Sequence, residues 1–293
     1  MGMNDAPNQD TLDQLVSILD LEELDLNLYR GRTPKEDRIR VFGGQVAGQA
    51  LVAAGRTVEQ GAVHSLHAYF LRPGDPSIPI LYQVDRIRDG KSFTTRRVVA
   101  IQHGKAIFNL SASFQIEEAG LEHQSAMPDA PDPETLPTFK QRTEPLVAAA
   151  PPELKRWLLR ERPIDVRPVE PIDYLSPRKR EPRQLVWIRA DGNLPDGSLL
   201  HQCVIAYASD MTLMDCATLP HAVSWWDNSF QMASLDHAMW FHRPCRADEW
   251  LLYAQQSPTA SGGRGFTTAS LFRRDGTLVV SVAQEGLIRQ RRR

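Results

Sequence analysis

"SLHAYFLRPGDPSIPILYQV", residues 65–84, and "DHAMWFHRPCRADEWLLYAQ", residues 236–255, are two versions of one pattern in this 293-residue chain. In each version an aromatic-rich run leads into an Arg-Pro pair, and a tyrosine follows that pair at the same interval, as Tyr82 and Tyr253. Self-similarity of this kind is the signature of a repeated structural unit. The repeat therefore predicts two halves with the same architecture.

A second matched block lies downstream of each copy. Residues 92–114 read "SFTTRRVVAIQHGKAIFNLSASF", and residues 265–284 read "GFTTASLFRRDGTLVVSVAQ". Thr-rich and β-branched runs flank "QHGK" and "RRDG", which are typical of turns in β-hairpins. Each block therefore predicts a strand, a turn and a second strand.

Each half also contains a helix candidate ahead of these strands. The candidates are "FGGQVAGQALVAAG", residues 42–55, and the opening of "HQCVIAYASDMTLMDCATL", residues 201–219. Both are apolar around most of the helical circumference, which predicts buried helices. Small residues such as Gly44 and Gly48 would let strands approach the helix closely, and because glycine is a poor helix former we expect packing or a ligand to explain its use here.

Strand-like runs precede each helix, at residues 24–31 and 38–44 in the first half and at residues 163–170 and 184–190 in the second. Each half thus has two strands, one buried helix and three or four further strands. An antiparallel sheet wrapped around the helix is the economical packing of such a set. We therefore predict an α+β fold.

The domain boundaries follow from composition. We predict one domain at residues 1–118 and a second at residues 163–293. Residues 119–162 are rich in Pro and acidic residues, which is typical of a linker, and they contain one short helix that docks through Trp157 and Leu158. In the first domain, "TLDQLVSIL", residues 11–19, predicts a surface helix with a capping box from Thr11 to Gln14.

Composition narrows the classes of function. Hydrophobic residues make up 42% of the chain, and a formal net charge of −2 gives no general attraction to nucleic acid or anionic lipid. We expect a cytoplasmic protein without membrane insertion, because the sequence has no signal-peptide pattern and no apolar run of about 18 residues. Three widely spaced cysteines favour reduced thiols over disulfides or a zinc site. Two basic clusters, residues 178–183 and 289–293, fit either solvated chain or contacts to a phosphorylated ligand.

Asp210 is a carboxylate within an apolar segment. Taking an unpaired charge out of water is costly, so the residue is exposed, caps or breaks the helix, or is kept for chemistry. The first half has no matching acid, because aligning Gln45 with Gln202 places Ala53 opposite Asp210.

Several motifs together resemble the acyl-CoA thioesterase II family. They are "FGGQVAGQAL", "LHAYFLRPGD", "HQCVIAYASD", "SLDHAMWFHRP", "EWLLY" and "VAQEGLIR". The resemblance implies two tandem hotdog domains, each an antiparallel sheet wrapped around one long buried helix, related as a pseudo-symmetric repeat. It also implies hydrolysis of fatty acyl-CoA to free acid and coenzyme A, with no metal and no organic cofactor.

The resemblance carries over a set of site residues. An Asp, a hydroxyl residue and a Gln hold the attacking water in that family, and the matching positions here are Asp210, Ser234 and Gln284. Ser234 stands where many relatives have Thr, so the hydroxyl is kept and the stiffening β-methyl is lost. Backbone amides at a buried helix N-terminus are the expected oxyanion donors, with Gly43 and Gly44 as candidates.

Alternatives remain open beside this interpretation. A hotdog enoyl-CoA hydratase would need an Asp and a His close together, and a non-catalytic acyl-CoA-binding protein would need neither. Along an extended strand His237 faces away from Asp236 and His242, so structural hydrogen bonding is expected there rather than a metal triad. Residues 224–230, "SWWDNSF", either line an acyl pocket or belong to the core. Exposed sheet edges predict a homo-oligomer, dimer or tetramer.

Overall fold

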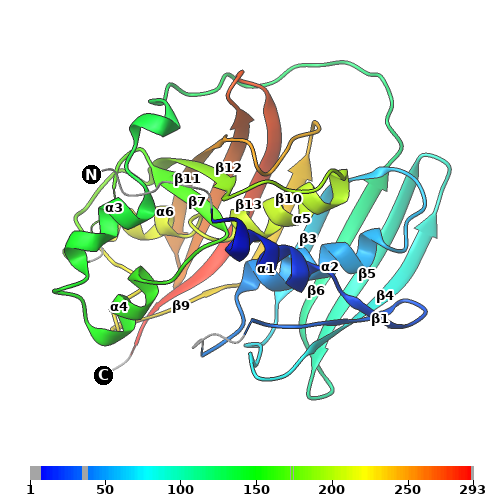
Figure 1. The fold of residues 1–293 in the computed structure, drawn as a ribbon, viewed down its shortest axis with the longest axis horizontal. Helices are drawn as coiled ribbons and strands as arrows, with labels where there is room; N and C mark the ends of the chain where they lie inside the picture. The colour runs from blue at the N-terminus through cyan, green and yellow to red at the C-terminus, as the bar shows by residue number, and fades with distance from the viewer. Residues whose placement is uncertain (1–7, 35–38, 172, 174, 292–293) are drawn as a thin grey trace.

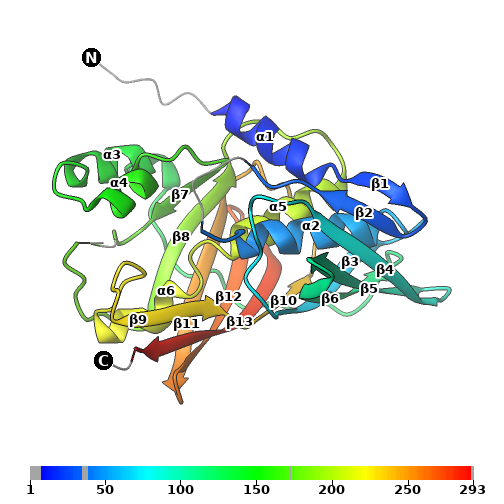
Figure 2. The same ribbon diagram turned by 90° about the horizontal axis from the view of Figure 1, so that it is seen from below.

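The computed structural model describes residues 8–34, 39–171, 173 and 175–291. A long antiparallel sheet forms one layer, and helices α1, α2 and α5 lie together against one of its faces (Figures 1 and 2).

The helices and strands follow the repeat in chain order. The first half contains α1 (Gln9–Leu19), β1 (Glu22–Asp25), β2 (Leu28–Gly31), α2 (Gly43–Gly55), β3 (Ala62–Phe70), β4 (Ile80–Asp89), β5 (Phe93–Gln102) and β6 (Lys105–Gln115). Between the halves lie η1 (Pro133–Thr135), α3 (Phe139–Thr143), η2 (Glu144–Leu146) and α4 (Pro152–Leu158). The second half contains β7 (Ile164–Pro168), β8 (Arg183–Ala190), α5 (Ser198–Ser209), α6 (Asp215–Thr218), η3 (Leu219–His221), β9 (Phe230–Ser234), β10 (Asp236–Phe241), β11 (Leu251–Ser261), β12 (Arg264–Arg273) and β13 (Leu278–Gln290).

The strand order shows the duplication directly. Across the sheet it runs β1-β2-β4-β5-β6-β3-β10-β13-β12-β11-β8-β7, and β9 pairs with β13 outside this path. From one end the order is β1, β2, β4, β5, β6, β3, and from the other end it is β7, β8, β11, β12, β13, β10. Each strand of the first half therefore has a counterpart at the same place in the second half. The halves join where β3 and β10 pair antiparallel, with His67 opposite Ala238. The predicted α+β fold of two tandem hotdog domains is confirmed.

The two central helices run antiparallel and pack on each other as well as on the sheet. A Cβ atom at Gly44 would lie 2.3 Å from the carbonyl oxygen of Tyr207, and one at Gly48 would lie 3.1 Å from that of Cys203. These glycines therefore serve close packing, as predicted, although the element that approaches α2 is the other central helix and not a strand. As a consequence, the N-terminus of α2 lies beside the C-terminus of α5.

Three local predictions were wrong. Residues 24–31 form a hairpin of β1 and β2 rather than one strand, because Asn27 adopts φ 61° in the turn and the apolar Leu24 and Leu26 stay exposed. Residues 39–42 form no strand, and Arg38 lies outside the described residues. The cap of α1 is Asn8, whose side chain accepts from the backbone N–H of Thr11, so Thr11 is already inside the helix.

The connecting segment contains more structure than the single helix predicted. The coil after β6 passes along one side of the molecule, and α3 and α4 then lie beside the second half (Figure 1). Leu154 and Leu158 of α4 are buried, and the Trp157 ring packs edge-on against Trp226 at 5.7 Å. The segment thus docks onto the second half through Trp157 and Leu158, as predicted.

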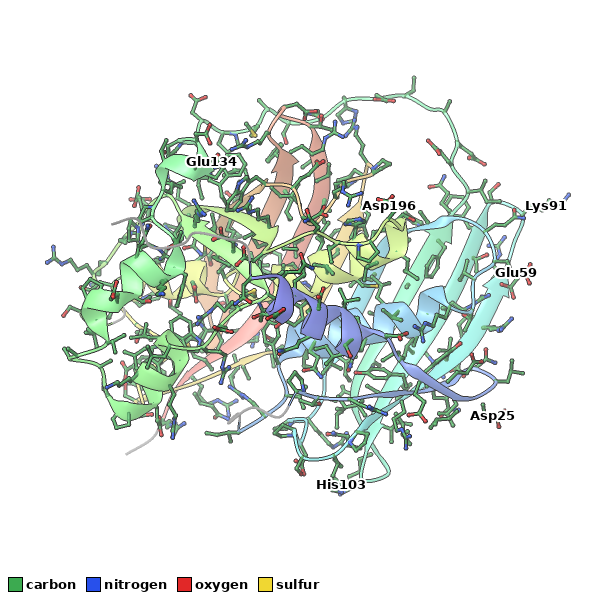
Figure 3. The ribbon with its side chains drawn as sticks, in the orientation of Figure 1. Asp25, Glu59, Lys91, His103, Glu134 and Asp196 are labelled. Atoms are coloured by element: carbon green, nitrogen blue, oxygen red, sulfur yellow. The ribbon has the colours of Figure 1, made fainter. Side chains whose placement is uncertain are left out.

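Charged side chains at the periphery contrast with the apolar layer between helices and sheet. None of the helices in the described part of the chain has the length and apolar composition that a membrane crossing requires. Figure 3 labels six exposed, ionisable side chains at the periphery: Asp25 at the end of β1, Glu134 in η1, and Glu59, Lys91, His103 and Asp196 in turns and loops.

Candidate active site

Asp210 lies immediately after α5, which ends at Ser209, and it serves as the C-cap residue of that helix. The helix therefore ends in the middle of the apolar segment, and the N-terminal cap considered from sequence is not formed. A carboxylate at the C-terminus of its own helix is disfavoured by the helix dipole. Its charge must therefore be stabilised by groups from elsewhere in the fold.

Two of those groups are the residues that sequence analysis paired with Asp210. Gln284 Nε2 donates to Asp210 Oδ1 at 2.7 Å, and Ser234 Oγ lies 3.5 Å from the same oxygen, at the long limit for a hydrogen bond. Ser234 in β9 is opposite Gly286 in β13, two residues from Gln284. Because residues two apart in a strand face the same way, the pairing of β9 with β13 brings both side chains to one side of the sheet.

The third contribution comes from the first half of the chain. Phe42 is the N-cap of α2 and makes no side-chain capping bond, so the amides of the first turn are left for other partners. The backbone N–H of Gly44 interacts with the Asp210 carboxylate. A Cβ atom at Gly43 would lie only 2.7 Å from Asp210 Oδ2. The positive end of the α2 dipole thus faces the carboxylate, and the glycines are what permits this approach.

These surroundings shift the acidity of Asp210. Burial raises its pKa to about 6, while hydrogen bonds from Gln284, Gly44 and Ser234 oppose the rise. The residue is only partly buried, because its side chain borders a cavity. At pH 7 the carboxylate is mostly ionised, yet it is more basic than an ordinary aspartate.

The backbone before Asp210 is held by two buried side chains that sequence analysis did not assign to the site. Tyr253 donates its hydroxyl to the carbonyl oxygen of Ser209 at 3.0 Å, and His237 Nε2 lies 2.8 Å from Ser209 Oγ. Burial lowers the pKa of His237 to about 4, so the imidazole is neutral around pH 7. The sequence signal for Tyr253 was its matched place in the repeat, because its counterpart Tyr82 likewise donates to the central helix of its own half, at Gln49 Oε1.

The cavity beside Asp210 has a volume of about 1060 Å³. Its wall combines the two halves and the connecting segment, and it includes Val41, Phe42, Phe70, Phe139, Trp157, Tyr207, Met211 and Leu235. Ser224, Trp225 and Trp226 also line it, so the pocket interpretation of "SWWDNSF" applies to these three residues. Arg178 and Arg180 of the first basic cluster reach the same cavity. The second cluster ends at Arg292 and Arg293, which lie outside the described residues.

Other polar side chains near the site have structural partners. Asp236 Oδ1 accepts from the backbone N–H of Glu285 at 2.6 Å, and His242 Nε2 lies 2.8 Å from Ser281 Oγ. This agrees with the predicted structural role of these residues. Within residues 8–34, 39–171, 173 and 175–291, no three His, Cys, Asp or Glu side chains are grouped so as to hold a metal ion.

The chain is similar to known proteins along most of its length. The family model described as acyl-CoA thioesterase matches residues 158–287, and that of the acyl-CoA thioesterase N-terminal domain matches residues 32–115. The chain is 46% identical over 284 residues to acyl-coenzyme A thioesterase 8 of Homo sapiens, covering 94% of this chain and 88% of that protein. It is 37% identical over 281 residues to acyl-CoA thioesterase 2 of Haemophilus influenzae, covering 96% and 98%.

A solved structure is similar over the same length. The crystal structure of an acyl-CoA thioesterase II from Mycobacterium marinum superposes with a TM-score of 0.77 at 48% identity, covering 94% of this chain and 98% of that one. Sequence and fold are therefore shared along nearly the whole chain.

Proposed function

The chain belongs to the acyl-CoA thioesterase II family and is a thioester hydrolase, and on this premise we propose that it cleaves fatty acyl-CoA with a water molecule activated by Asp210. The observation that carries the proposal is the position of this carboxylate. It borders the cavity, accepts a bond from Gln284, lies near the Ser234 hydroxyl and faces the N-terminus of α2.

In the proposed first step Asp210 removes a proton from water as the water oxygen attacks the thioester carbonyl carbon. A general base works best when its pKa lies near the working pH, and burial raises the pKa of Asp210 to about 6. In this proposal Gln284 orients the carboxylate and the Ser234 hydroxyl holds the water. The 3.5 Å separation of Ser234 Oγ from Asp210 Oδ1 leaves room for the hydroxyl to turn toward that water.

The carbonyl π electrons move to oxygen in this step, so the site needs donors for an oxyanion. The backbone amide of Gly43, at the first position of α2, is our candidate. Gly44 was a second candidate from sequence, but its N–H interacts with Asp210, so it would have to change partner to bind the oxyanion. When the intermediate collapses, the C–S bond breaks and the departing thiolate takes the proton from Asp210, which restores the base.

A hydratase is the less favoured alternative. That chemistry needs an acid and a histidine side by side, and no histidine is found among the described residues that line the cavity. His237, which lies close to Asp210 in the fold, is buried against Ser209 and is held by that contact.

Thiol release is the direct test. Purified protein is incubated with saturated acyl-CoAs of increasing chain length, and free coenzyme A is followed with a thiol reagent. We expect turnover without added metal or cofactor. Hydratase activity is tested with crotonyl-CoA, by following the loss of the enoyl absorbance. Calorimetry with acyl-CoA detects binding without turnover. Binding with no thiol release would support a storage or sensor role instead.

Two further properties remain predictions. A homo-oligomer is expected because the sheet ends in β1 and β7, each paired on one side only within the described chain. Sedimentation analysis would show whether a dimer or a tetramer forms. The cytoplasmic location is a prediction from sequence, which fractionation of cells would test.

A further inference from the structure

We propose that Asp215 is a second recognition residue of the cavity, where its carboxylate accepts a hydrogen bond from a neutral N–H or O–H group of the thioester substrate. This inference rests on the proposed function, since it concerns how the same substrate is bound. Asp215 lines the cavity but takes no part in the proposed steps of hydrolysis.

Asp215 lies close to the reacting centre. It is the first residue of α6, and the four residues between it and Asp210 form helical turns, so the two acids are about 8–10 Å apart along the chain. Met214 places α6 over the sheet beside Gln284, because Thr267 Oγ1 contacts Met214 Sδ and also donates to the carbonyl oxygen of Gln284. A substrate with its thioester at Asp210 therefore has atoms within reach of Asp215.

The carboxylate of Asp215 has spare acceptor capacity. Its Oδ1 accepts from Trp225 Nε1 at 2.6 Å, and the described residues provide no ion pair to it. The nearby Arg180 is paired with Glu170. A carboxylate can accept about four hydrogen bonds, so one indole N–H leaves most of that capacity unused.

Two other acids, whose side chains are less than a tenth exposed, have cationic partners. Asp165 is paired with Arg167 at 2.8 Å, and Asp248 is paired with Arg246 at 2.9 Å. These acids are structural, and each has a cation that compensates for its burial. Asp215 shares with Asp210 a position on the cavity wall and neutral hydrogen-bond donors in place of a cation.

Acid–base behaviour supports the same interpretation. Burial raises the pKa of Asp215 to about 7, and only the Trp225 bond opposes this rise. A partly desolvated carboxylate with so few partners, located in a cavity, is typical of a functional group. A hydrogen bond from a substrate would compensate for its burial.

Charge limits what the ligand group can be. A carboxylate repels phosphates, so the nucleotide end of coenzyme A is not expected at Asp215. Neutral donors are available in two parts of an acyl-CoA: the amides and hydroxyl of the pantetheine arm, and a hydroxyl on the acyl chain. Both sources share the chemistry we propose, and two substrates separate them.

Asp215→Asn is the informative variant, because the amide oxygen still accepts from Trp225 while the charge is lost. Charge-assisted hydrogen bonds are roughly twice as strong as neutral ones, so we expect kcat/KM to fall about tenfold. The assay compares octanoyl-CoA with 3-hydroxyoctanoyl-CoA at pH 8, where Asp215 is ionised because its pKa is about 7. An equal loss on both places the donor in the pantetheine arm, and a loss confined to the hydroxyacyl substrate places it in the acyl group.

Asp227→Asn is the matched control, because Asp227 lies on the same loop as Trp225, accepts from Ser229 and does not line the cavity. Asp215→Ala provides a second variant in case the amide disturbs folding, which thermal unfolding would reveal. Folded Asp215 variants with unchanged kcat/KM on both substrates would overturn the inference. Absence of thiol release by the unaltered protein would instead refute the proposed function, so the two failures are distinguishable.

Discussion

Replacing Asp210 with asparagine should abolish most activity and at the same time make the folded protein more stable at alkaline pH. Loss of a general base typically costs about 10²–10⁴-fold in rate. A merely structural aspartate would behave in the opposite way, because its removal would weaken the fold and leave the chemistry intact. The two measurements together therefore identify the role of this residue.

The stability gain can be worked out from the shifted acidity. The pKa of Asp210 rises from its ordinary 3.8 to about 6, which at 1.36 kcal/mol per pKa unit corresponds to a penalty of ~3 kcal/mol for the buried charge. Partial exposure to the cavity reduces that figure, and the asparagine NH₂ would face the Gly44 amide, so we expect a net gain of ~1–2 kcal/mol.

The sign of the pH dependence follows from proton binding. Between about pH 4 and pH 6 the folded state holds a proton on Asp210 that the unfolded chain has lost, so stability falls as the pH rises through this range. Above pH 6 the penalty is fully present. The advantage of Asp210→Asn should therefore appear at pH 8 and vanish near pH 4.

Urea unfolding at pH 4 and pH 8 gives the stability difference, and thiol release from octanoyl-CoA gives the activity. Glu285→Gln is a suitable control, because Glu285 follows Gln284 in β13 and pairs with Arg264 on the outside. An Asp210→Asn protein that keeps more than a tenth of the normal kcat/KM would refute the reasoning. A variant that is inactive but less stable at pH 8 would show that the loss of activity comes from damage to the fold.

The remaining predictions concern the neighbours of Asp210. In the unaltered protein kcat/KM should rise with pH through about pH 6, where Asp210 ionises, and a flat profile from pH 5 to 7 would contradict a base with this pKa. Gln284→Leu removes the 2.7 Å bond and should lower kcat about 10–100-fold while moving the acid limb of the pH profile upward, because this bond lowers the pKa of Asp210. Ser234→Ala should cost about tenfold in kcat and Ser234→Thr should retain activity, which steady-state kinetics on the three proteins would check. Gly43→Ala would place a Cβ atom 2.7 Å from Asp210 Oδ2 and 2.8 Å from Phe70 Cε1, so we expect about a 10²-fold loss of kcat with little change in unfolding by urea.

Sequence alone determined the repeated architecture, because strand and turn patterns are local properties of the chain. The "QHGK" and "RRDG" turns lie between β5 and β6 and between β12 and β13, as predicted. The apolar runs that predicted buried helices became α2 and α5. Local patterns failed at residues 24–31, where a tight turn at Asn27 interrupts an alternation that resembles one strand.

Only the tertiary structure decided what surrounds Asp210. Its partners come from residues 43–44, 234 and 284, which no short pattern connects, and the resemblance alone suggested their association. Because α2 packs antiparallel on α5, the positive N-terminal end of α2 faces the Asp210 carboxylate, whose charge is disfavoured at the C-terminus of α5. The same packing makes Gly44 a partner of the carboxylate, and the fold around α6 leaves Asp215 on the cavity wall with Trp225. Such contacts depend on which surfaces meet in three dimensions, and hydrophobic periodicity carries no information about that.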